Sequence, residues 1–343
     1  MDTEKNNARI SFLTEVKVYL PHNSNFGLKN KEMPIHTILG ANGTIANELV
    51  PILRASGHQI RLVCRKLKPV SGAETFAVDV LDRDQVFQAV KGSDVVYLLV
   101  GLEYKIKVWR SCWPIVMRNT IEACKATGAR LIFFDNVYMY GKTEGRMTEG
   151  TPFRPSSKKG MVRAEIAEML IREMKSGELK ALIARSADFY GPRARTTSVA
   201  GLMVFEKMKK GKTAQWFVNA KQPHSFTYTP DAAKALYMLA TSETAYGQTW
   251  HLPSTLPAIS GTEFIAIAAK YMQAGTKIQV VPRWLVRVIG LFIPIMEELV
   301  EMLYQNEYAY EFDSSKFEKA FEFRPTSYEE GIKQTAEWFL AAS

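Results

Sequence analysis

Two glycines and an alanine, spaced three residues apart, are the residues of this sequence whose types and spacing most directly allow chemistry. They lie in His36–Ala46, HTILGANGTIA, where a short apolar run meets Gly40, Gly43 and Ala46. Glycine lets the backbone approach a ligand closely, and a small third residue lets the following helix pack on the preceding strand. A helix that begins at such a turn can bind a pyrophosphate with its free backbone amides. The same pattern also fits a tight turn without a ligand.

The charges that follow the second expected strand bear on which dinucleotide would fit. A site that prefers NAD usually has an acidic residue there, which holds the ribose hydroxyls. This sequence has Cys64, Arg65 and Lys66 instead, and two cations can pair with an additional 2′-phosphate. We therefore predict NADP(H) rather than NAD(H); the alternative is that Arg65 and Lys66 are solvated loop charges. Asp79, after the third strand, either accepts a hydrogen bond from the adenine amino group or caps the next turn.

The elements that must position these residues alternate between apolar strands and helical patterns. This alternation is typical of βαβ units, so we predict an α/β fold with a doubly wound parallel sheet. The expected strands are Ile35–Leu39, Gln59–Cys64, Glu74–Val78, Asp94–Val100, Arg130–Phe134, Leu179–Ala184 and Thr249–Leu252. The expected helices are Thr44–Ser56, Asp84–Val90, Trp113–Thr127 and Glu165–Met174.

The chain divides into three expected segments. Residues 1–32 differ in character from the rest of the sequence and are interpreted as an N-terminal extension or arm, with one possible strand at Glu15–Leu20. Residues 33–192 form the expected dinucleotide-binding core. Residues 193–343 form mainly a substrate-binding subdomain, with segments that return to the core.

Composition narrows the classes of partner. The 343 residues are 47% hydrophobic, and 44 Lys and Arg against 35 Asp and Glu give a net charge of +9, which suits anionic small molecules. The basic residues are spread along the chain, so we expect no nucleic-acid partner. The three cysteines and five histidines show no metal-ligand spacing, and we expect no metal. An odd cysteine count without a signal-peptide pattern predicts a reducing, cytoplasmic location.

The most apolar stretch late in the chain is Trp284–Met296, WLVRVIGLFIPIM. It is too short to cross a bilayer, contains Arg287 and is interrupted by Pro294. We expect a core or pocket-lining helix here, and no membrane partner for the protein. Membrane association and a subunit interface are the alternatives for this stretch.

Several motifs, taken in order, resemble those of the extended short-chain dehydrogenases/reductases, also called the NAD-dependent epimerase/dehydratase family. The similarity extends from about Ile35 to the C-terminus. Its glycine motif is similar to Gly40-Ala41-Asn42-Gly43-Thr44-Ile45-Ala46, with alanine in place of the usual third glycine. Further matches are Asp79-Val80, Asn119, Tyr140-Gly141, Arg185, Tyr190-Gly191-Pro192, Ser225–Leu236 and Phe312–Ile332.

The resemblance implies a Rossmann-type sheet with a smaller C-terminal substrate-binding subdomain. It also implies a possible homodimer through helices near Trp113–Thr127 and Val162–Met174. Together with the charges after the second strand, it gives a set of candidate cofactor contacts. They are Gly40, Asn42, Gly43, Thr44, Ile45, Arg65, Lys66, Asp79, Val80, Val100, Gly101, Asn119 and Arg163.

The catalytic signature of the family is where this sequence departs from it. Active members carry Ser or Thr four residues before the tyrosine of the YG pair, and then Tyr-x-x-x-Lys on the next helix. Here the aligned residues are Asn136, Lys159 and Arg163, so the chain is identified as an atypical member without the Tyr-x-x-x-Lys pair. Asn136 can still donate to a carbonyl oxygen, whereas Arg163 can hold ribose hydroxyls but cannot release a proton.

Lys159 leaves two alternatives open. If it is desolvated and close to Arg163, a lowered ammonium pKa would let it act as a general acid; if it points to solvent, it is a surface charge. Tyr138 is a candidate replacement acid, provided that its end of the strand stays regular. Asp188, Tyr190 and His224 are candidate substrate contacts near the carboxyl edge of the sheet. The alternatives are that Asp188 caps a helix or turn and that His224 is a structural residue of a turn.

These residues favour an NADP-preferring oxidoreductase that acts on a carbonyl or hydroxyl of a small organic substrate. One alternative is an NAD(P)-binding sensor or regulator without redox turnover. Another is an epimerase or dehydratase that oxidises its substrate transiently.

Overall fold

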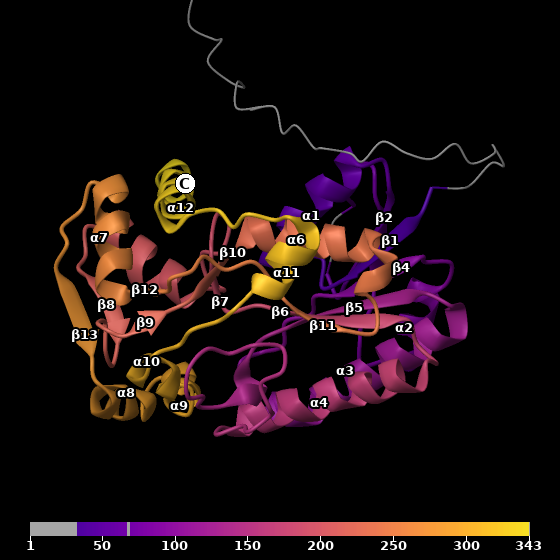
Figure 1. Ribbon diagram of the computed structural model, residues 1–343, viewed down its shortest axis with the longest axis horizontal. Helices are drawn as coiled ribbons and strands as arrows, with labels where there is room; N and C mark the ends of the chain where they lie inside the picture. The colour runs from indigo at the N-terminus through magenta and orange to yellow at the C-terminus, as the bar shows by residue number, and fades with distance from the viewer. Residues whose placement is uncertain (1–32, 67–68, 343) are drawn as a thin grey trace, which may run out of the picture. The chain divides into compact units, whose positions relative to one another are not determined.

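A seven-stranded parallel sheet forms the centre of the part of the chain that the computed structural model describes, residues 33–66 and 69–342 (Figure 1). The strand order is β11-β6-β5-β4-β1-β2-β3. The bounds are β1 Ile35–Leu39, β2 Gln59–Cys64, β3 Glu74–Ala77, β4 Val95–Leu98, β5 Arg130–Asp135, β6 Ala181–Arg185 and β11 Thr249–His251. The predicted α/β doubly wound sheet is confirmed. The arm expected at 1–32 and the strand expected within it lie outside the described residues.

Helices cover both faces of this sheet. On one face α1 (Thr44–Ala55) packs against α6 (Thr229–Thr241); on the other lie α2 (Arg83–Val90), α3 (Ile106–Thr127) and α4 (Lys158–Ser176). Successive strand residues serve opposite faces: Ile38 packs with the helices of the first face and Leu39 with those of the second. Because helices cover both faces, most residues of these strands are apolar. Polar residues within them are buried with hydrogen-bond partners, as Thr37 and Arg61 show.

Two helices begin earlier than their apolar periodicity predicts. α3 begins at Ile106 rather than Trp113 and continues through Pro114, because Trp109 and Trp113, one turn apart, both pack into the core. α4 begins at Lys158 rather than Glu165. The Ser157 side chain caps it by accepting a hydrogen bond from the Gly160 amide at 3.0 Å.

The second half of the chain adds small strand pairs and helices at the carboxyl edge of the sheet. β7 (Asp188–Tyr190) pairs with β10 (Phe226–Tyr228), β8 (Ala214–Phe217) with β13 (Ile278–Val281), and β9 (Pro223–His224) with β12 (Ile259–Ser260). The helices here are α5 Glu206–Lys209, α7 Gly261–Met272, α8 Arg283–Gly290, α9 Pro294–Val300, α10 Tyr304–Glu307, α11 Ser315–Phe321 and α12 Tyr328–Ala341. Through β11, the chain returns to the sheet.

The stretch Trp284–Met296 differs from the expected core helix. It forms α8 and the start of α9, which are separated by a turn before Pro294. Leu291 is 79% exposed and Phe292 82% exposed, and Trp284 is also exposed. The expectation of a buried helix is therefore wrong for most of this stretch.

Candidate active site

The glycine turn lies where the strand order changes direction, between the carboxyl ends of β1 and β4. Gly40 has a φ of +97°, and a Cβ there would lie 2.6 Å from the Leu99 carbonyl oxygen. The Gly43 amide donates to the Gly40 carbonyl oxygen at 3.0 Å. α1 has neither a side-chain cap nor an acidic residue in its first turn. The start of α1 is thus without a side-chain partner, and it lies at the crevice in which ligands bind in open α/β sheets.

The loop after β2 lies beside this turn. The Asn42 side-chain amide donates to the Lys66 carbonyl oxygen at 3.0 Å, and Arg65 and Lys66 are both exposed. Thr44 bonds through its hydroxyl to the hydroxyl of Thr197 at 2.7 Å, while Ile45 is buried. The structure thus brings the candidate cofactor contacts of the first two strands to one edge of the sheet.

Among the remaining candidate cofactor contacts, Asp79 and Asn119 form hydrogen bonds that hold the loop after β3. Asp79 accepts a hydrogen bond from the Leu81 amide at 3.0 Å, as a turn cap does. Asn119, buried on α3, donates to the Val80 carbonyl oxygen at 3.1 Å. Val100 and Gly101 follow β4, and Gly101 has open space where a Cβ would be.

A buried carboxylate that the sequence motifs do not single out organises the end of β5. Asp135 accepts hydrogen bonds from Nε of Arg163 and from the Asn136 amide, both at 2.8 Å. Nε of Arg185 lies 3.5 Å from its other oxygen. Arg163 is thus held by a carboxylate through a charge-assisted pair. The Asn136 side-chain oxygen accepts from the Tyr138 amide at 3.0 Å.

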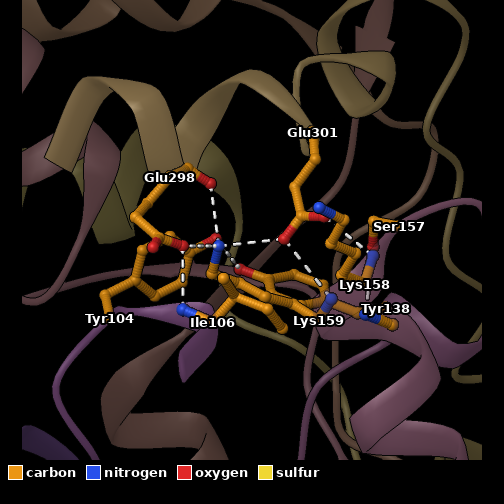
Figure 2. A network of polar contacts seen from close by, with 9 residues as sticks. Tyr104, Ile106, Tyr138, Ser157, Lys158, Lys159, Glu298 and Glu301 are labelled. Atoms are coloured by element: carbon orange, nitrogen blue, oxygen red, sulfur yellow. Dashed lines mark hydrogen bonds and ion pairs between the residues drawn. The ribbon is translucent and has the colours of Figure 1, made fainter. Parts of the chain in front are cut away.

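Lys159 is completely buried and is paired with two glutamates of α9 and its C-terminal end, as Figure 2 shows. Its Nζ donates to the Glu298 carbonyl oxygen and to the Glu301 carboxylate, both at 2.9 Å, and also contacts the Glu298 carboxylate. The interpretation of Lys159 as a surface charge is therefore wrong. The alternative of a lysine activated by a nearby arginine did not anticipate these two acidic partners.

The same glutamates bond the first amides of two helices. Glu298 accepts from the Ile106 amide at 2.9 Å, and Glu301 accepts from the Lys158 amide at 2.7 Å. Negative charge is favourable at a helix N-terminus. The two carboxylates therefore stabilise the contact of α9 with the starts of α3 and α4. About 140 residues separate Lys159 from these partners, and no local sequence pattern indicates them.

Tyr138 and Tyr140 face different surroundings, because β5 ends at Asp135 and Tyr138–Tyr140 forms a short 3₁₀ helix rather than a regular strand. The Tyr138 hydroxyl lies 3.5 Å from that of Tyr104, and burial raises the pKa of Tyr138 to about 12. The Tyr140 hydroxyl is buried between Arg185, at 2.7 Å, and Nε2 of His251, at 2.8 Å. Of these two tyrosines, Tyr138 lines the pocket that is described next, and Tyr140 does not.

A pocket at the carboxyl edge contains two of the three candidate substrate contacts. Asp188 and His224 both line it, and His224 Nε2 lies 3.0 Å from an Asp188 carboxylate oxygen. Tyr190 instead packs in the core of the second half, 1% exposed. The other lining residues are Tyr104, Tyr138, Val199, Ala200, Met203, Val204, Gln215, Trp216, Phe217, Phe226, Leu299, Met302, Leu303, Gln305 and Asn306.

Residues 33–66 and 69–342 can be searched for helices that could span a membrane and for groups of side chains that could bind a metal. None of these helices is both long and apolar enough to cross a membrane. No group of three or more His, Cys, Asp or Glu side chains in this part of the chain is arranged to hold a metal ion.

Comparison with known proteins places this geometry in context. A model of the NAD dependent epimerase/dehydratase family matches residues 36–251. The UDP-N-acetyl-alpha-D-glucosaminuronate decarboxylase of Bacillus cytotoxicus is 24% identical over 88% of this chain and 96% of its own. A 3-diazoavenalumate denitrifying reductase of a Streptomyces species is 29% identical over 45% of this chain and 56% of its own.

Solved structures share the fold. The UDP-glucose 4-epimerase of Thermus thermophilus in complex with NAD is similar with a TM-score of 0.75 at 19% identity, covering 90% of this chain and 100% of the other. The UDP-glucuronic acid 4-epimerase of Bacillus cereus in complex with NAD has a TM-score of 0.73 at 18% identity, covering 89% of this chain and 98% of its own. The family model covers more than half of the sequence, from the first strand of the sheet to the last. The chain belongs to the NAD-dependent epimerase/dehydratase family.

Proposed function

We propose that this protein is an NADP-preferring oxidoreductase that acts on a carbonyl or hydroxyl group of a small organic substrate. The observation that carries the proposal is the glycine turn at the switch point of the sheet, with the uncapped start of α1 beside it. These features fit a dinucleotide pyrophosphate. When bound, the nicotinamide supplies or accepts the hydride of the reaction.

The preference for NADP(H) is supported by the loop after β2. Arg65 and Lys66 are exposed beside the glycine turn. Guanidinium and ammonium groups there would pair with a 2′-phosphate, which NAD lacks.

Proton transfer would use the corner that we call the α4 corner: Asp135, Asn136, Tyr138, Lys159 and Arg163. The side-chain nitrogen of Asn136 is a donor suited to a substrate carbonyl oxygen. Tyr138, whose pKa burial raises to about 12, stays protonated at neutral pH and can donate a proton but is a poor base. Arg163 acts as a positioning residue, since Asp135 already holds it.

The pocket favours an apolar or aromatic substrate. Its described lining is mostly aliphatic and aromatic, and contains no lysine or arginine that could pair with a diphosphate. The acid Asp188 would repel one. We therefore expect uncharged aryl or alkyl carbonyl compounds to be better substrates than the UDP-sugars named for the similar proteins.

The test has two stages. Calorimetric titration of the full chain should give binding of NADPH in the micromolar range or tighter, with NADH weaker. Consumption of NADPH should then be followed with aryl aldehydes, alkyl ketones and UDP-sugars. Asn136→Ala and Tyr138→Phe should each lower kcat by about tenfold or more. The absence of micromolar NADPH binding would exclude the proposal.

A second candidate is a cofactor-binding protein without turnover. The double pairing of Lys159 with Glu298 and Glu301 favours it, because that ammonium has no free position toward a substrate. It predicts tight NADPH binding and no consumption with any of these compounds. A turnover that Asn136→Ala abolishes would contradict it.

A third candidate is an epimerase or dehydratase that oxidises its substrate transiently, as the names of similar proteins suggest. It predicts that the purified protein retains its cofactor. Strict dependence on added NADPH would count against it.

A further inference from the structure

The turn between α8 and α9 exposes an unbroken apolar run. Every residue from Leu291 to Ile295 is exposed, and Leu291 and Phe292 at the tip keep 79% and 82% of their surface in water. Trp284 and Val288, one turn apart on the adjoining α8, are also exposed. A contiguous patch of this kind on a folded protein marks a contact with another phase or molecule. We call these residues, Trp284, Val288 and Leu291–Ile295, the apolar tip.

Exposed cations lie on α8, within the apolar tip's own segment, and at the starts of α3 and α4, which α9 contacts. Arg287 is exposed on α8 between Trp284 and Val288. Lys107, Arg110 and Lys158 line a shallow surface depression at the starts of α3 and α4. That depression borders α9, since Glu298 and Glu301 bond the Ile106 and Lys158 amides. Among the acids here, Glu298 and Glu301 are partly buried and engaged, Glu103 is paired with Lys105, and Glu297 is exposed. The balance of the exposed charges is positive.

Figure 1 shows that α8, α9 and α4 lie along one side of the described part of the chain, with α12 on the other side. Exposed Trp, Leu and Phe on and between short helices, together with Lys and Arg, are the side chains that let a segment lie in the interface of an anionic bilayer. We propose that the protein docks peripherally on anionic lipid membranes, inserting the apolar tip and placing the surrounding cations at the headgroups. This inference is independent of the proposed oxidoreductase activity.

The inner side of the same segment connects this surface to the site. Leu299 on α9 and Met302 and Leu303 after it line the apolar pocket. Docking would therefore place the wall of that pocket next to the membrane, from which an apolar compound could enter.

Sedimentation with sucrose-loaded vesicles tests the proposal. The full chain should bind vesicles of phosphatidylcholine with about a third phosphatidylserine, bind pure phosphatidylcholine weakly, and release the anionic vesicles at high salt. The double variant Leu291→Ser/Phe292→Ser should lose about tenfold or more of its vesicle affinity. Arg110→Gln should lose about fivefold, which corresponds to about 1 kcal/mol.

The matched control is Leu340→Ser, which replaces an exposed leucine on α12, on the other side (Figure 1); its vesicle binding should equal that of the parent. NADPH affinity and thermal unfolding should be unchanged in every variant. Failure of the parent to bind anionic vesicles would overturn the proposal. So would an oligomer in ultracentrifugation that Leu291→Ser/Phe292→Ser dissociates, because a second copy would then cover the apolar tip.

Discussion

The glycine turn and the α4 corner lie at the same edge of the sheet, yet they are built in opposite ways. The turn depends on backbone: Gly40 is required by its φ of +97° and by the Leu99 carbonyl 2.6 Å from where a Cβ would be. The α4 corner depends on side chains. There, Asp135 holds the Arg163 guanidinium, and Glu298 and Glu301 hold the Lys159 ammonium. A backbone site tolerates change around it, whereas a network of buried charges is altered by one substitution.

The largest effect should come from breaking the network of the α4 corner. Asp135→Ala would leave Arg163 and Arg185 buried without this carboxylate. We expect a loss of about 4 kcal/mol in the free energy of unfolding, measured by urea denaturation. The double variant Asp135→Ala/Arg163→Met should recover part of this loss. A loss below about 1 kcal/mol in the single variant would show that the corner is not organised by this charge.

The corresponding change in the glycine turn should be somewhat smaller. Gly40→Ala would place a Cβ in a left-handed conformation against backbone atoms that cannot turn aside. We expect a loss of about 3 kcal/mol in stability and a large loss of NADPH affinity. Gly275→Ala is the matched control, because Gly275 lies away from the turn in sequence and a Cβ there meets nothing within 4 Å. Equal behaviour of the two variants would contradict the role of Gly40.

This contrast explains how much the sequence could predict. The bounds of β1 and β2 and the doubly wound order follow from apolar runs and glycines that are adjacent in the chain. The partners of Lys159 and Arg163 do not, because Glu298, Glu301 and Asp135 meet them only after the sheet and α9 are assembled. The exposed apolar tip was missed for a related reason: hydrophobicity along a sequence does not reveal which face finds a partner.

Acid should lower the stability of the folded protein through buried histidines, of which His251 bonds the Tyr140 hydroxyl close to the α4 corner. Burial and the nearby Arg185 guanidinium lower the pKa of His251 to about 3. The unfolded chain binds a proton there below about pH 6.5 and the folded chain does not, so stability falls as the pH decreases from about 6.5 toward 3. At about pH 5 the loss is about 2 kcal/mol.

Thermal unfolding as a function of pH measures this loss. His251→Gln should flatten the decline between about pH 6.5 and 5, although not entirely, since burial also lowers the pKa of His36 to about 3. An unchanged slope would show that His251 is protonated in the folded protein.

The smallest effect should come from a substitution beside the glycine turn that changes the preference between NADPH and NADH. Arg65 is exposed beside the turn, and Arg65→Ser would remove one cation without disturbing the backbone. NADPH affinity should fall by about tenfold, which corresponds to about 1.4 kcal/mol, while NADH affinity should stay the same because NADH has no 2′-phosphate. Titration of both cofactors gives the ratio, and Lys212→Ser, at a cation on another loop, serves as control. Equal losses for both cofactors would mean that Arg65 supports the loop rather than the choice of cofactor.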